Sequence, residues 1–200
     1  MSPRARTRRP RSAAAVAKTH CRVIGLDDRQ FRAALRAKPE FALMLMSVMV
    51  ARLRDTLTRL NGNSFPAGWR EAQAMDKDLL ADLQKEIGFK ARFRYAAGRT
   101  IMREGHLGVG LYIVLEGQVA VRVGNTLVEK AGPGSVIGEM SLVDRTPRFA
   151  TAVAESACVL LAVSRLEFLR LVAKNPQFGA SVLGTVSERV RSMAERCKLP

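Results

Sequence analysis

Apolar residues follow a strand-like pattern in the middle of the chain. Between residues 77 and 145 the apolar runs are short and are separated by glycines, as in FKARFRY, TIMRE, LYIVLEG, VAVRV and TLVEKA. Short apolar runs bounded by turn residues predict β-strands, and a closely spaced series of them predicts a barrel or jelly roll. In VRVGNTLV, Gly124 can take the positive φ that a two-residue hairpin loop needs.

Helical periodicity marks the regions on either side of these strands. One short helix is predicted at Asp78–Ile87, and longer ones follow Pro39 and Pro176, where apolar residues recur every three or four positions. The fold class is therefore predicted to be α+β and mainly β, with an antiparallel jelly-roll β-barrel flanked by an N-terminal helix and C-terminal helices. The apolar stripe after Pro176 could pack on its own domain or pair with a second copy, so a homodimer through the C-terminal helix is one expectation.

Two capping signals mark further helix starts. Ser164 is followed by Glu167, and Asp27 or Asp28 is followed by Gln30. Such pairs satisfy the free amides at the beginning of a helix. Each pair comes just after a short apolar run, CVLLAV at 158–163 and CRVIGL at 21–26, and we predict both runs to be strands.

The beginning of the chain repeats its end. Residues 8–61 align without a gap on residues 145–198, at a shift of 137 positions, with 14 identities that include Arg11 with Arg148 and Cys21 with Cys158. The opening is also rich in Arg and Ala and free of acids, as an import signal would be. Because a second copy lies deep in the chain, we interpret the opening as part of an internal repeat and hence as structure.

Composition and charge limit the function classes. The hydrophobic content of 48% is that of a globular protein, and the longest apolar run, FALMLMSVMVA, is too short to span a membrane. Three cysteines without metal-ligand spacing indicate reduced, mostly buried thiols and a cytoplasmic protein. The net charge of +15 suits a phosphate-bearing partner or a solvated basic face, but no DNA-binding motif is evident.

The segment GPGSVIGEMSLVDRTPRFATAVA at 132–154 carries the candidate chemistry. Gly138 permits a tight turn, and Glu139–Leu142 could form one helical turn whose free amides face an anion. The guanidinium of Arg148 can hold two phosphate oxygens, and the carboxylate of Glu139 can accept a ribose hydroxyl. This combination suits a sugar phosphate. No nucleophile elbow, HExxH motif or Walker loop is present, so we do not expect an enzyme.

The sequence around this segment resembles the cyclic-nucleotide-binding domain of catabolite-activator-type regulators, protein kinase A regulatory subunits and nucleotide-gated channels. The resemblance covers about 78–198 and is carried by AAGRTIMREG, GLYIVLEGQVAV, the cassette GEMSL…PRFAT and the closing helices. It implies a ligand, cyclic AMP or cyclic GMP, and no cofactor. The implied ligand-binding residues are Gly138, Glu139, Met140, Ser141, Leu142, Arg148, Phe149 and Ala150, with Ala150 on the next strand.

Two departures from the family pattern keep alternatives open. Phe149 stands where the family usually has a small residue beside the phosphate, and the loop GHLGVG lacks an acidic residue that is often present. Phe149 could stack on the base or fill the pocket, so a member of the fold that binds no nucleotide is one alternative. A catabolite-activator-type transcription regulator is the other, although we do not expect this chain alone to bind DNA.

The resemblance also explains the repeat. Residues 1–61 correspond to the last third of a truncated first domain of the same type, 62–76 to a linker, and 77–200 to a complete domain. Ser2 stands opposite Glu139, so the half-copy should bind no nucleotide. We expect residues 76–200 to fold alone, because 1–61 presents apolar faces without a barrel of its own. The effector protein is unknown.

Overall fold

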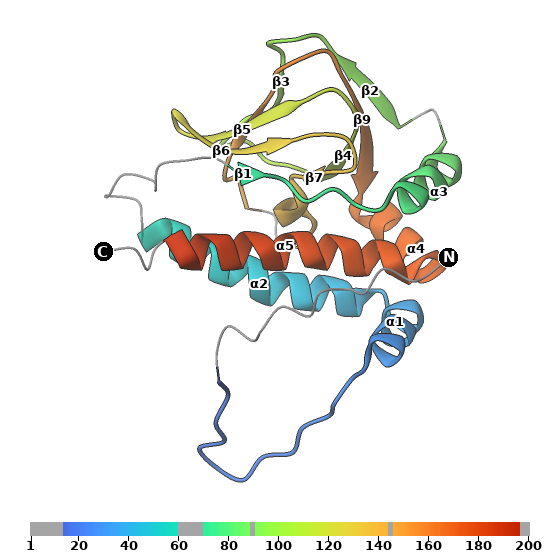
Figure 1. Ribbon diagram of the computed structural model, residues 1–200, viewed down its shortest axis with the longest axis vertical. Coiled ribbons are helices and arrows are strands. Elements are labelled where there is room, and N and C mark those ends of the chain that lie inside the picture. The colour runs from blue at the N-terminus through green and yellow to red at the C-terminus, as the bar shows by residue number, and fades with distance from the viewer. Residues whose placement is uncertain (1–13, 60–69, 89–90, 144–145, 197–200) are drawn as a thin grey trace.

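The computed structural model describes residues 14–59, 70–88, 91–143 and 146–196 (Figure 1). The helices are α1 (Asp28–Ala37), α2 (Glu40–Arg59), α3 (Lys77–Ile87), the 3-10 turn η1 (Glu139–Leu142), α4 (Arg165–Lys174) and α5 (Pro176–Arg196). The strands are β1 (Arg70–Glu71), β2 (Arg92–Tyr95), β3 (Thr100–Met102), β4 (Gly110–Glu116), β5 (Val119–Val123), β6 (Thr126–Ala131), β7 (Val136–Ile137), β8 (Thr151–Ala154) and β9 (Cys158–Ser164). The described residues contain more helix than strand, so the fold is mixed rather than mainly β.

The strands form two sheets. One has the order β1-β6-β5-β8-β3 and the other β2-β9-β4-β7, and every pairing is antiparallel except that of β1 with β6. Both sheets contribute buried residues to one shared core, including Val119, Ala152 and Leu160. The two-residue hairpin between β5 and β6 is confirmed, with Gly124 at φ 54° and Val123 paired with Thr126.

The central strands β4 and β9 are buried on both faces. Leu160 on β9 belongs to the core between the sheets, whereas Leu161 and Val163 pack in a second core that includes the helices. A strand covered on both sides needs apolar residues at successive positions, which explains why LYIV and CVLLAV are continuous apolar runs.

Helices α1, α2, α4 and α5 lie together beneath the sheets, and α3 lies at the side of the sheets (Figure 1). Asp27 caps α1 in a complete capping box with Gln30, and the Ser164 hydroxyl at the start of α4 accepts a hydrogen bond from the Glu167 amide at 3.2 Å, so both predicted helix starts are confirmed. The repeat shift of 137 positions carries the bounds of α1 onto those of α4. The matching longer helices, α2 and α5, pack along each other and run in the same direction.

The half-copy is part of the main core. Leu35 of α1 and Met46 of α2 belong to the same buried cluster as Phe168 of α4 and Val182 of α5. The apolar faces of α1 and α2 are therefore covered by the second repeat copy. The exposed apolar faces that led us to expect residues 76–200 to fold better without residues 1–61 are therefore not present. The division of the chain into 1–61, 62–76 and 77–200 stays a prediction.

The predicted strand at 21–26 is absent, and Val23 and Ile24 are 86% and 90% exposed. The equivalent strand β9 pairs with β2 and β4, and the described chain offers no second pair of such strands. Cys21 is consequently exposed, while Cys158 is buried. The expected linker, of which 62–69 lie outside the described residues, also contains β1, and this strand pairs in parallel with β6.

Over the ranges described, no helix combines the length and apolarity that a membrane crossing requires.

Candidate functional site

The predicted helical turn is present as η1. Gly138 precedes it in the left-handed region, with φ 75°, and the Ser141 amide donates to the Gly138 carbonyl at 3.3 Å. A Cβ atom at position 138 would lie 2.3 Å from Nη1 of Arg148. Glycine is therefore required at this position for two reasons, the left-handed backbone conformation and the close approach of the Arg148 guanidinium.

Arg148 is held in place by backbone carbonyls. Its Nη1 donates to the Gly138 oxygen at 2.6 Å and its Nη2 donates to the Gly110 oxygen at 2.8 Å, and the residue is only 8% exposed. Burial lowers the pKa of Arg148 from its ordinary value, and the nearby Tyr112 and Glu139 partly oppose this. A guanidinium has five N–H donors, so these two bonds fix its orientation and leave donors for a ligand.

A pocket opens between the cassette, the strands β5 and β6, and the helices. Seven of the eight predicted site residues line it: Gly138, Glu139, Met140, Ser141, Arg148, Phe149 and Ala150. Leu142 does not, because its side chain is fully buried in the core. Ala150 lies one residue before β8 rather than on it. Val121, Val123 and Val128 form an apolar wall that could receive a flat ring.

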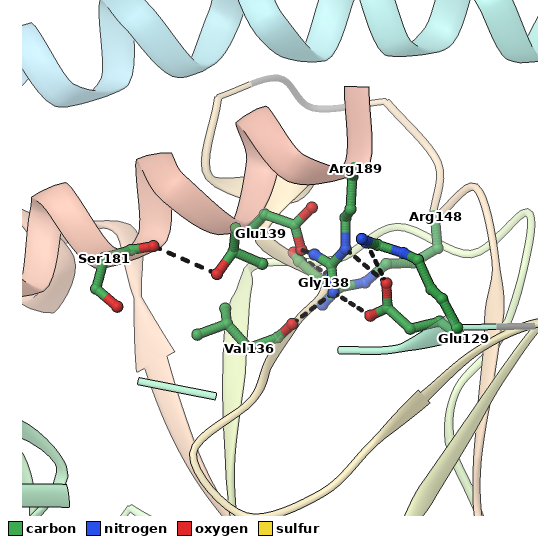
Figure 2. A network of polar contacts seen from close by, with 9 residues as sticks. Glu129, Val136, Gly138, Glu139, Arg148, Ser181 and Arg189 are labelled. Carbon is green, nitrogen blue, oxygen red and sulfur yellow. Dashed lines mark hydrogen bonds and ion pairs between the residues drawn. The ribbon is translucent and has the colours of Figure 1, made fainter. Parts of the chain in front are cut away.

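Arg189 of α5 joins the pocket to the helices (Figure 2). Its Nη1 lies 2.5 Å from the Glu139 carboxylate, its Nη2 donates to Glu129 at 2.5 Å, and Nη2 also donates to the Val136 carbonyl at 2.7 Å. Arg70 of β1 forms a further ion pair with Glu129. Arg70, Glu129, Arg189 and Glu139 thus form one chain of alternating charges.

This chain of charges is shielded from water. Glu129 and Glu139 are 4% and 2% exposed. Burial raises the pKa of Glu129, but the ion pairs with Arg189 and Arg70 outweigh it and the pKa is lowered overall. Burial likewise lowers the pKa of Arg189, and its two carboxylate partners more than reverse this. Glu129 and Arg189 are therefore both charged near neutral pH.

Several lining residues were not predicted from the sequence. They are Arg189, Ser192 and Met193 of α5, Glu129 of β6, Arg70 of β1, and Leu53 and Arg54 of α2. One signal was available for Arg189, because a charged residue between the apolar positions 186 and 190 is repeated as Arg52 in the first copy. The described residues contain no cluster of side chains suited to hold a metal ion.

Comparison with known proteins identifies the domain. Residues 92–175 match the model of the cyclic nucleotide-binding domain. The chain is 43% identical over 75 residues to a cAMP-dependent protein kinase regulatory subunit of Eremothecium gossypii, a match that covers 38% of this chain and 16% of the subunit. It is 33% identical over 110 residues to a cyclic AMP receptor protein of Thermus thermophilus, over 52% of this chain and 51% of the receptor.

A solved structure supports the same assignment. The catabolite activator protein of Thermus thermophilus has a TM-score of 0.52 and 31% identity, over 62% of this chain and 59% of the activator. The chain thus spans only part of these relatives, which are regulatory or binding proteins. The two-sheet fold, the cassette and the family match together show that residues 92–175 form a cyclic nucleotide-binding domain.

Proposed function

We propose that this chain is a non-catalytic regulatory module that binds one cyclic nucleotide, cyclic AMP or cyclic GMP, and signals by movement of the closing helices α4 and α5. The carrying observation is the 2.5 Å ion pair between Arg189 of α5 and Glu139 of the cassette. A ligand that engages Glu139 necessarily changes the environment of a residue on the closing helix. The site and the helix are therefore physically linked.

The two cassette residues have different roles in this proposal. Arg148, oriented by two carbonyls, binds the cyclic phosphate through its remaining N–H groups. Glu139 accepts a hydrogen bond from the ribose 2′-hydroxyl, in competition with Arg189 for its lone pairs. The apolar wall of β5 and β6 covers the base. Phe149 lines the same pocket, so a stacking role fits its position.

Calorimetry with cyclic AMP, cyclic GMP and linear 5′-AMP tests the proposal. Arg148→Ala removes a charge-assisted contact to a phosphate and should weaken binding by about 2–4 kcal/mol. Arg11→Ala, at the matching position of the half-copy and outside the described residues, should leave the affinity unchanged. Glu139→Ala should weaken binding less than Arg148→Ala does. It should also reduce the difference in affinity between ribose and 2′-deoxyribose ligands. Equally weak binding by the parent and all variants would identify a member of the fold that binds no nucleotide.

Signalling through the helices needs a separate measurement. Hydrogen exchange of the amides in α5 should change when the nucleotide is added at saturation, because Arg189 then shares Glu139 with the ligand. Exchange in α3, which lies outside the pocket, serves as the control. If the nucleotide binds without any change in the exchange of α5, the proposed ligand stands and the proposed signalling step is wrong.

The similarity to a catabolite activator favours one alternative function, transcription regulation by a protein of which this chain is a part. A salt-dependent shift of duplex DNA by this chain would support it, and no binding at low salt would count against it. A homodimer through α5 and a cytoplasmic location remain predictions. Within the chain, the apolar stripe of α5 is already buried, with Val182 and Val186 inaccessible, so a dimer would have to use another face.

A further inference from the structure

Glu129 of β6 is a buried carboxylate that the proposed function leaves without a role. Its side chain lines the same pocket as Glu139, yet the residue is only 4% exposed. Taking a carboxylate out of water is costly, and well-packed apolar residues of similar volume often serve stability as well as a buried ion pair does. The place of Glu129 beside the ligand site therefore indicates a role in binding.

Glu129 is the main anchor of Arg189. Its Oε2 accepts from Nε of Arg189 at 3.2 Å and its Oε1 accepts from Nη2 at 2.5 Å, so the two groups meet in a two-point contact (Figure 2). Nη2 also donates to the Val136 carbonyl at 2.7 Å. The contact with Glu139 is made by a different nitrogen, Nη1, at 2.5 Å. Arg189 can therefore release Glu139 and keep three hydrogen bonds through Nε and Nη2.

The proposed function makes the ligand compete with Arg189 for Glu139, because a ribose 2′-hydroxyl and this guanidinium both donate to the same carboxylate. The Arg189 side chain is only 14% exposed, and a charge in such a place is costly once it loses its last partner. With Glu129 present, Arg189 keeps a carboxylate whichever group Glu139 binds. Resting on the proposed function, we infer that Glu129 is a positioning residue for ribose recognition, which holds Arg189 while Glu139 binds the ligand.

Arg70 limits how firmly Glu129 can hold Arg189. Strand β1 pairs in parallel with β6, and Arg70 and Glu129 are register partners in this pairing. Nη2 of Arg70 donates to Oε2 of Glu129 at 2.5 Å, and this is the same oxygen that accepts from Nε of Arg189. The two guanidinium groups thus share one oxygen of Glu129. Removing Arg70 should therefore strengthen the hold of Glu129 on Arg189.

Calorimetry on the full chain tests the inference with four ligands: cyclic AMP, cyclic GMP and the 2′-deoxy form of each. The measured quantity is the ratio of the affinities for the ribose form and the 2′-deoxyribose form of the same nucleotide. A change that acts on the phosphate, the base or the overall fold affects both forms and cancels in this ratio. A change in the availability of Glu139 affects the ribose form alone, because the 2′-deoxy form lacks the hydroxyl.

Two substitutions should move this ratio in opposite directions. Glu129→Gln keeps the shape of the side chain but removes its charge, so Arg189 then depends on Glu139 and the ratio should decrease about tenfold. Glu129→Asp, which keeps the charge but shortens the reach, should give a smaller decrease. Arg70→Gln leaves Glu129 to Arg189 alone, and the ratio should increase about threefold.

Glu155→Gln is the matched control. Glu155 forms an ion pair at 2.7 Å with Lys130, the neighbour of Glu129 in the sequence, and it does not line the pocket. The variant removes one ion-paired carboxylate, as Glu129→Gln does, and its ratio should equal that of the parent. Circular dichroism melts check that each variant is folded, and Arg70→Gln provides the test if the variants of Glu129 are not.

The outcomes separate the role of Glu129 from the proposed function. A ratio unchanged in Glu129→Gln, or a ratio that decreases in Arg70→Gln, overturns the role of Glu129 while nucleotide binding stands. A ratio that decreases equally in Glu155→Gln also overturns it, because the effect then belongs to any lost carboxylate. A parent that binds the ribose and 2′-deoxyribose forms equally overturns it too, since Glu139 then does not hold the ribose. A parent that binds none of the four ligands overturns both this role and the proposed function.

Discussion

Replacing Arg189 with alanine should expose how much the ion-pair chain contributes to stability. The change removes both carboxylate contacts of this guanidinium, at 2.5 Å to Glu129 and 2.5 Å to Glu139, and its bond to the Val136 carbonyl. The two carboxylates are 4% and 2% exposed, so water cannot easily replace the lost partner. Arg189→Ala therefore leaves buried charge with less compensation.

The burial and the remaining partners of the two carboxylates set the cost of this change. Removing one partner of a buried ion pair typically costs about 3–5 kcal/mol of the free energy of unfolding. Glu129 retains Arg70, so we expect the lower end, about 3 kcal/mol. Burial raises the pKa of a carboxyl that has lost its opposing charge. In Arg189→Ala a raised pKa lets the carboxyl take up a proton at pH 5, which removes the uncompensated charge. The decrease in the free energy of unfolding should therefore be larger at pH 7 than at pH 5.

Urea denaturation at the two pH values measures both effects. Arg191→Ala, on the same helix but outside the pocket, is the matched control and should change the free energy of unfolding by much less. The double variant Glu139→Gln with Arg189→Ala should be more stable than Arg189→Ala alone, because one uncompensated charge is gone. A loss within about 1 kcal/mol of the control, or a loss equal at both pH values, would refute the reasoning.

Two further predictions concern the parent protein and its parts. The pKa of Glu129 is lowered in the folded state, so its stabilising contribution is fully present above the ordinary value of 4.5 and is lost as the pH falls through the lower folded-state value. In urea titrations between pH 5 and about 2, the free energy of unfolding of Glu129→Gln should therefore decrease less with falling pH than that of the parent. A fragment of residues 76–200 should unfold at lower urea and self-associate more than the full chain in gel filtration, because Val182 and Val186 lose the cover of α2. A fragment as stable as the full chain would show that α2 adds nothing to the core.

Local sequence patterns determined most of the secondary structure and the cassette. The hairpin at Gly124, the cap at Ser164 and the turn Glu139–Leu142 are all set by residues close together in the chain, whose conformational preferences act locally. The same locality explains why seven of the eight predicted site residues line one pocket, since they lie within residues 138–150.

Tertiary structure decided the partners of those elements. CRVIGL at 21–26 has the pattern of a strand, yet a strand needs neighbouring strands as hydrogen-bond partners. In the second repeat copy those partners, β2 and β4, are paired with β9, so they are not available to residues 21–26. Likewise, nothing local predicts that Arg70 forms a strand with β6, or that Arg189 meets two carboxylates far away in the sequence. The repeat showed that α2 resembles α5, but only the packed chain placed Arg54 in the pocket, because side-chain contact depends on how helices 137 residues apart lie together.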